Sequence, residues 1–334
     1  MNRGSVYKQG EIVAELERRL DEGFYSSGFP VGSLLAAEFG VNIKTINKAI
    51  NQLVEAGRLA RKRGVGTFVV SHTAGDRQVE VLFEGYSALF DHPFWGEIWN
   101  GCITGLLDAG FRPVLTQIQA DESGRLQLEG FRFSPTMGKL LLGITHPRFL
   151  ELVSLQGVPA VSAGDEIDDP DFPQVCFDYW PGVRDAMTFL VKRGCRRIAF
   201  LGETRNEFNP KLLNKFHAWR RALESLGVYD PELAEHTRPL PEAAGSALRS
   251  LLGRTKPDAV FVAGDHQVPC VERVLKENGL RLPVVGCDGL AFANWPTVSL
   301  PRRAAGEAAA RLLATRMRGN ISTDRVVLST HFVC

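Results

Sequence analysis

The chain has 334 residues, of which 44% are hydrophobic and 23% charged, and its formal net charge is +1. This length exceeds that of one ordinary domain, so two or three domains with a soluble globular composition are expected. The first residues lead into a charged amphipathic segment and no run approaches ~18 uninterrupted apolar residues, so we expect neither a signal peptide nor a membrane span.

Three helices are predicted before residue 58. Apolar residues recur on one face of the segment Ile12–Leu20, as in an amphipathic helix. Ser33 is suited to cap a second, short helix that stops at Gly40, and Asn42 is suited to cap a third. The short link between the second and third helices has the spacing of a helix-turn-helix.

A basic hairpin is predicted after these helices. Residues 58–61 and 67–70 have the pattern of two strands, and Lys62–Gly66 forms a glycine-bearing turn between them. From Gly40 to Thr67 the chain has six basic residues and one acidic residue, a local charge of +5. A helix-turn-helix followed by such a hairpin is a winged helix, and its basic face is typical of a surface that binds DNA phosphates.

DNA contacts are expected from this winged helix. The alternative is a solvated basic face on an ordinary helical hairpin, but charge, helix spacing and the glycine turn together favour DNA. The phosphate contacts expected from the charge are Lys44, Lys48, Arg61, Lys62 and Arg63, the base contacts are Ile43, Thr45 and Asn47, and Ser33, Asn42, Gly64 and Gly66 complete the predicted DNA-binding set.

The first 70 residues resemble the GntR class of bacterial winged-helix repressors. The resemblance is carried by Phe39-Gly40-Val41-Asn42 and above all by Gly64-Val65-Gly66-Thr67-Phe68-Val69. The chain departs from the family where Ser33 and Asn47 replace arginines and Asn42-Ile43 replaces Ser-Arg at the start of the recognition helix. These departures bear on the operator sequence.

From Gln78 onward, short apolar strands alternate with amphipathic helices. This alternation favours parallel sheets with right-handed crossovers, and ligands of such sheets bind at the carboxyl ends of the strands. Two series of such units indicate two lobes. The predicted strands are 79–83, 112–116, 139–144, 158–162, 174–178, 197–201, 259–263 and 284–287, and the predicted helices are 94–109, 147–155, 181–193, 210–226, 242–252 and 268–278.

The second part of the chain resembles the sensor domain of the LacI/GalR repressors. The motifs are Arg196-Arg197-Ile198-Ala199-Phe200-Leu201-Gly202, Pro257–Asp265 and Val284-Val285-Gly286-Cys287-Asp288. The resemblance implies a periplasmic-binding-protein type I fold, with two lobes and a small molecule in the cleft. A GntR-type head on this sensor is similar to the arabinose-responsive repressors of bacteria.

The predicted fold class is therefore α/β, an N-terminal winged helix followed by a two-lobed parallel α/β sensor. The expected domains are a DNA-binding domain at 1–71, a linker at 72–77 and a ligand-sensing and dimerisation domain at 78–334. Within this sensor, lobe 1 is expected at about 78–174 and 300–318, and lobe 2 at about 175–290 and 324–334.

The resemblance also implies the ligand contacts. Phe94 and Trp95 match a family segment whose aromatic residues border the cleft, and aromatic faces suit sugars or flat bases. Asp265 and Asp288 match polar positions after two strands, and Lys215 occupies the register of a ligand-clamping arginine. The alternatives are a buried helix start for the two aromatic residues and a capping role for the two aspartates.

No enzyme motif is visible. A dinucleotide enzyme would need Gly-x-Gly-x-x-Gly between a strand and a helix, and the chain has no Walker loop or His-Glu-x-x-His. The six cysteines are scattered without a Cys-x-x-Cys pair, which favours reduced thiols in the cytoplasm and no metal site or cofactor. A secreted binding protein is disfavoured by the basic head and the missing export signal.

We therefore expect a cytoplasmic transcriptional regulator, most simply a repressor. Its expected partners are double-stranded DNA with a pseudo-palindromic operator, a second copy of the chain in a homodimer, and a small-molecule effector such as a carbohydrate. The alternative is a DNA-binding regulator with a closed cleft that responds to a protein partner.

Overall fold

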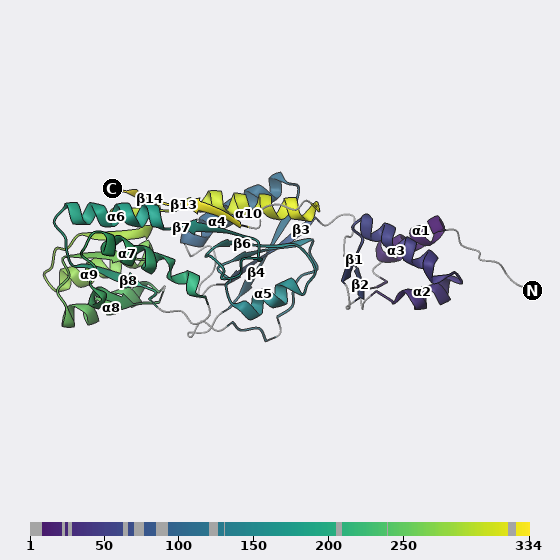
Figure 1. The fold of residues 1–334 in the computed structure, drawn as a ribbon, viewed down its shortest axis with the longest axis horizontal. Helices are drawn as coiled ribbons and strands as arrows, with labels where there is room; N and C mark the ends of the chain where they lie inside the picture. The colour runs from purple at the N-terminus through teal and green to yellow at the C-terminus, as the bar shows by residue number, and fades with distance from the viewer. Residues whose placement is uncertain are drawn as a thin grey trace, which may run out of the picture.

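The computed structural model describes residues 9–21, 24–25, 29–62, 66–69, 77–84, 93–119, 126–129, 131–204, 209–238, 240–319 and 325–334. The N-terminal helices stand apart from two lobes that each contain a sheet (Figure 1). Within these ranges, no helix is long and apolar enough to cross a membrane.

The head is a three-helix unit with a hairpin. Gly40 ends the second helix in the left-handed region (φ 63°), and the Asn42 side chain accepts a hydrogen bond of 2.8 Å from the backbone N–H of Lys44, so both predicted helix signals are confirmed. The predicted cap at Ser33 is wrong, because the helix begins earlier, with Val31 at the capping position. The elements are α1 (Gln9–Asp21), α2 (Gly32–Phe39), α3 (Ile43–Glu55), β1 (Leu59–Lys62) and β2 (Gly66–Val69).

Lobe 1 is a parallel six-stranded sheet in the order β13-β7-β6-β5-β3-β4. The helices α4 and α10 pack against each other and, with the strands, bury a core of large apolar residues. Its elements are β3 (Gln78–Glu84), α4 (Pro93–Asp108), β4 (Arg112–Ile118), β5 (Gly138–Leu142), α5 (Pro147–Ser154), β6 (Ala160–Gly164), β7 (Gln174–Asp178), α10 (Arg302–Met317) and β13 (Arg325–Ser329).

Lobe 2 is a six-stranded sheet in the order β14-β12-β11-β10-β8-β9, parallel except that β14 runs antiparallel to β12. Helices cover both faces, because the apolar strands build one core with α6 and α7 and another with α8 and α9. Its elements are α6 (Trp180–Lys192), β8 (Ile198–Gly202), η2 (Pro210–Leu213), α7 (Asn214–Ser225), η3 (Pro231–Leu233), β9 (Ala234–His236), α8 (Pro241–Arg254), β10 (Ala259–Val262), η4 (Asp265–Gln267), α9 (Val268–Glu277), β11 (Val284–Asp288), β12 (Thr297–Ser299) and β14 (His331–Val333).

The lobe boundaries differ from the sequence-based expectation. Strand β7, expected in lobe 2, pairs with β6 and β13 in lobe 1, and of the last two strands only β14 joins lobe 2. The chain consequently crosses between the lobes near Tyr179, Pro301 and Thr330. Two of these crossovers are joined, because the Thr330 hydroxyl donates to the Asp178 carbonyl at 2.9 Å. The assignment was wrong because the local pattern of a buried strand does not specify its neighbour.

Candidate functional site

The third helix of the head presents a basic surface. Lys44 and Lys48 are exposed on α3, and neither forms an ion pair with another residue that the structure describes. Ile43 begins the helix with a side chain that is 46% exposed, while Thr45 and Asn47 are partly exposed. The predicted contacts of this helix therefore lie on accessible positions, as a helix that enters the major groove requires.

Arg61 connects the hairpin to this helix. From β1 its guanidinium donates to the side-chain oxygens of Asn47 at 2.8 Å and Asn51 at 2.9 Å. The sequence predicted that Arg61 contacts DNA phosphate and that Asn47 faces base edges. In the structure the hydrogen bond from Arg61 also orients the Asn47 side chain. Two predicted contacts are thus brought together by side-chain hydrogen bonds.

The turn of the hairpin falls partly outside the described residues. Arg63, Gly64 and the side chain of Lys62 are not described, so their predicted DNA contacts stay predictions. Gly66 begins β2 with a φ of 134° and pairs with Lys62 across the hairpin. A side chain is rarely tolerated at this φ, which explains the glycine at this position.

Five residues from both lobes meet at the carboxyl ends of the strands, and we call them the interlobe cluster: Phe94, Asp165, Tyr179, Lys215 and Asp288. Lys215 is its centre. Its Nζ donates to Asp288 Oδ1 at 2.8 Å and to the Ala263 carbonyl at 2.7 Å, and it lies 5.2 Å from the ring centroid of Tyr179 and 6.0 Å from that of Phe94. The predicted residues Phe94, Lys215 and Asp288 are therefore brought together.

The carboxylates of this region have perturbed ionisation. Burial is the main cause that raises the pKa of Asp165 to about 6, while Lys215 lowers it and Asp288 raises it. Burial, with help from Asp165, raises the pKa of Glu84 at the end of β3 to about 7. Burial lowers the pKa of Lys215, but Asp288 together with Cys287 and Tyr179 more than offsets this, so the ammonium remains charged.

Asp288 also has a strained backbone. It is the one described residue other than glycine with positive φ, at 121°. Such a conformation costs on the order of 1–3 kcal/mol and persists where the surrounding structure imposes it, often at ligand sites. The strain and the Lys215 contact together mark Asp288 as a candidate site residue.

Two predicted ligand contacts have other roles in the structure. Trp95 is buried against Phe83, and a Cβ at Gly164 would lie 2.6 Å from its ring, so it packs the core at the start of α4. Asp265 is fully buried, and its carboxylate accepts hydrogen bonds from Leu290 N, Trp295 Nε1 and Thr297 Oγ1. This aspartate holds the loop after β11; it neither caps α9 nor keeps a carboxylate oxygen for a ligand.

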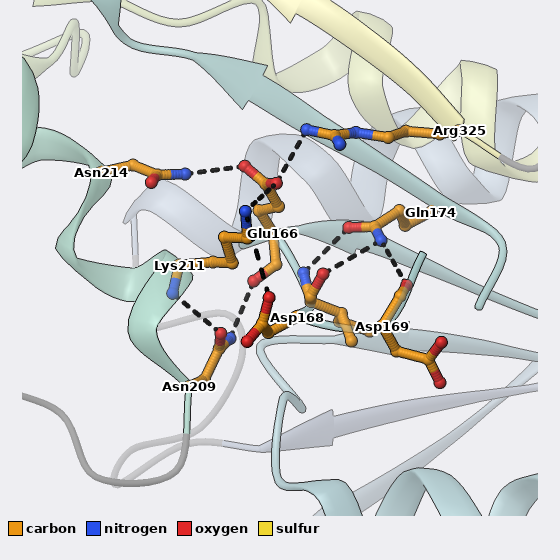
Figure 2. Close-up of polar contacts among 9 residues, drawn as sticks. Glu166, Asp168, Asp169, Gln174, Asn209, Lys211, Asn214 and Arg325 are labelled. Carbon is orange, nitrogen blue, oxygen red and sulfur yellow. Dashed lines mark hydrogen bonds and ion pairs between the residues drawn. The ribbon is translucent and has the colours of Figure 1, made fainter. Parts of the chain in front are cut away.

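A polar bridge beside the cluster joins the lobes (Figure 2). Glu166, which follows β6 in lobe 1, accepts a hydrogen bond from Asn214 of α7 at 2.7 Å, and its carbonyl accepts one from Asn209 at 2.8 Å. Arg325 of β13 donates to the other carboxylate oxygen at 2.7 Å. Lys211 Nζ lies 3.5 Å from the same carboxylate. We call this set, Glu166 with Asn209, Lys211, Asn214 and Arg325, the Glu166 bridge.

Sequence reasoning missed several of these residues. Asp165 and Glu166 come shortly after a predicted strand, so the rule for carboxyl ends of parallel strands was a usable signal. Tyr179 follows a strand that had been assigned to the other lobe. No group of His, Cys, Asp and Glu side chains that could hold a metal ion occurs in the described part of the chain.

Two family models match the two parts of the chain. Residues 8–69 match the bacterial regulatory proteins of the gntR family, and residues 187–333 match the periplasmic binding protein-like domain. Together with the fold, these matches show a gntR-type helix-turn-helix head joined to a periplasmic-binding-protein-like sensor. The chain is thus a DNA-binding transcriptional regulator of the GntR/LacI type.

Known regulators are similar to most of this chain. The arabinose metabolism transcriptional repressor of Geobacillus stearothermophilus is 26% identical over 328 residues, which cover 89% of this chain and 86% of the relative. The transcriptional regulator GntR of Escherichia coli K12 is 24% identical over 244 residues, 68% of this chain and 69% of that protein. Among solved structures, the complex of transcriptional regulator CelR with cellobiose has a TM-score of 0.71 and 25% identity, covering 92% of this chain and 99% of that chain.

Proposed function

We propose that this regulator is a repressor whose affinity for its operator is controlled by a small molecule bound at the interlobe cluster. The observation that carries the proposal is Lys215, a charged residue of lobe 2 that lies against Phe94 and Tyr179 of lobe 1 while it pairs with the strained Asp288. Aromatic faces beside charged hydrogen-bonding groups suit a carbohydrate. The cellobiose complex of the similar regulator CelR supports this ligand class.

Control of DNA binding follows from the position of the site. A ligand that contacts both lobes favours the arrangement in which they are close, and it shifts the protein only as far as it binds that arrangement more tightly. We propose a homodimer on a pseudo-palindromic operator, because two heads on one DNA multiply the affinity of each. We also propose a head at 1–71 and a linker at 72–77 before the sensor.

The test is an operator gel shift with and without a panel of metabolites, alongside calorimetry. Lys215→Met should leave operator binding intact and remove the response to the effector. The matched control is Lys192→Met, because Lys192 is exposed at the end of α6. Operator binding that no metabolite changes, or a Lys215→Met protein with wild-type effector affinity, would count against the proposal.

A further inference from the structure

A buried arginine at the boundary of the lobes has unused hydrogen-bond donors. Arg302 is 7% exposed, and its Nη2 donates to the Gly289 carbonyl at 3.0 Å. Its Nε and Nη1 are buried and have no hydrogen-bond partner among the described residues. Arg302 also forms no ion pair within the described part of the chain. A buried guanidinium in this state is unfavourable unless something supplies acceptors and negative charge.

The packing of α10 places Arg302 beside the interlobe cluster. A Cβ at Gly101 of α4 would meet Arg303 at 2.0 Å, and a Cβ at Gly105 would meet Ala310 at 2.7 Å. The contacts advance in the same direction along both helices, so α10 runs parallel to α4. Arg302, which begins α10, therefore lies towards the end of lobe 1 where Phe94 begins α4.

The other contact of Arg302 reaches lobe 2. Gly289, whose carbonyl accepts from it, directly follows Asp288. Burial raises the pKa of Cys287 above its ordinary value, and both Lys215 and Arg302 lower it. The two cations therefore act on the same buried thiol. Lys215 is paired with Asp288, whereas none of the carboxylates that the structure describes pairs with Arg302.

We propose that Arg302 binds an anionic oxygen group of the effector, a carboxylate or a phosphate. The effector is then a sugar acid or a sugar phosphate, in place of a neutral sugar. This inference rests on the proposed function, because it assumes that the interlobe cluster is the effector site. A planar guanidinium is suited to both anionic groups, since it donates several N–H bonds in fixed directions.

The direct test is calorimetry of the full chain with aldonic acids, aldose phosphates and their neutral parent aldoses. Arg302→Met should lower the affinity for the anionic ligand about 10- to 100-fold, the effect of losing charge-assisted hydrogen bonds. Arg303→Met is the matched control, because the neighbouring Arg303 is exposed and pairs with Glu307 at 3.3 Å. Comparison of the affinities for aldonic acids and for aldose phosphates identifies whether a carboxylate or a phosphate is bound.

A second measurement needs no effector. Inorganic phosphate should raise the Tm of the wild-type chain and of Arg303→Met but not that of Arg302→Met. Without any anion, Arg302→Met should be at least as stable as the wild type, because it removes an uncompensated buried charge. If Arg302 serves packing alone, Arg302→Met should instead have a lower Tm than the wild type, and phosphate should raise the Tm of both proteins equally.

The outcomes separate this inference from the proposed function. If neutral aldoses release the operator and Arg302→Met binds them as the wild type does, the anion inference is wrong and the proposed function stands. If no sugar of either class changes operator binding, the proposed function fails. The Tm measurement with inorganic phosphate then tests whether Arg302 binds an anion, independently of any effector. If phosphate raises the Tm of Arg302→Met as much as that of the wild type, the inference is overturned.

Discussion

Glu166→Gln tests whether the Glu166 bridge helps to hold the lobes together. The Glu166 side chain is 9% exposed, and the Asn214 contact crosses from one lobe to the other at 2.7 Å. A hydrogen bond to a charged group contributes about 1.5–3 kcal/mol. The amide keeps one acceptor oxygen, which can serve Asn214, but its NH2 group cannot accept the bond that Arg325 donates to the other oxygen. The change therefore removes the charge and one acceptor, and the exposed partner Arg325 contributes little. We therefore expect the change to weaken lobe closure by about 1–2 kcal/mol.

This weakening should appear in the affinity for the effector. A ligand that binds the closed arrangement is weakened by the factor by which that arrangement is depopulated, here about 5- to 30-fold. Calorimetry with the effector measures the change, and small-angle scattering of the ligand-free chain should show more separated lobes. Asp168→Asn is the control, because Asp168 is 54% exposed and 4.0 Å from Lys211, and its effect should stay within about twofold.

One result would refute the reasoning about the bridge. If Glu166→Gln binds the effector as tightly as the wild type and has the same scattering profile, the contact between Glu166 and Asn214 does not contribute to closure. A loss of folded structure in circular dichroism would also contradict the prediction, because the bridge would then be needed for the fold of a lobe.

Three further results are expected. Lys48→Ala should weaken binding to all DNA sequences about equally and should flatten the dependence of log affinity on log salt concentration by about one unit. Arg61→Ala should also alter sequence preference, because Arg61 orients Asn47. Salt-dependent gel shifts on two operators distinguish the two variants. Asp288→Asn should fold and bind the operator but lose effector affinity in calorimetry, and unchanged affinity would remove Asp288 from the site. The pKa of Glu84 is raised from 4.5 to about 7, so the folded chain holds a proton that the unfolded chain releases, and this stability is present below about pH 4.5 and lost as pH rises through 7. Glu84→Gln should flatten the pH dependence of unfolding by about 3 kcal/mol, measured by denaturant titration at pH 5 and 8.

Local sequence signals were sufficient for the elements of the head and for the α/β alternation of the sensor. Asn42 can cap α3 and Gly40 can end α2 with contacts made within a few residues. Strands and helices can be told apart by the spacing of apolar residues along the sequence, which involves only residues close together in the chain. Phe94, Lys215 and Asp288 could be chosen because each lies close to the carboxyl end of a strand or in a motif that a known family shares.

The tertiary structure decided which elements became neighbours. β7 had the pattern of a buried strand, and that pattern suits either sheet; pairing with β6 and β13 placed it in lobe 1. Glu80 and Lys139 form an ion pair of 2.6 Å inside lobe 1, although they lie on strands separated by a helix and another strand. Neither the sequence separation nor the residue types predict such a contact.

The same reason explains the site residues that sequence analysis missed or misassigned. Asp265 has the sequence position of a ligand contact, but Trp295 and Thr297 occupy its carboxylate. Arg302 has no local signal, because its burial depends on α10 packing beside α4 and on Gly289 in the other lobe. The sequence by itself determined the head and the two-series α/β pattern, since short-range periodicity and caps encode them. The class of regulator followed from motifs that resemble those of known families. The interlobe contacts arise from residues distant in the chain, so their partners and energies exist only once the lobes have packed.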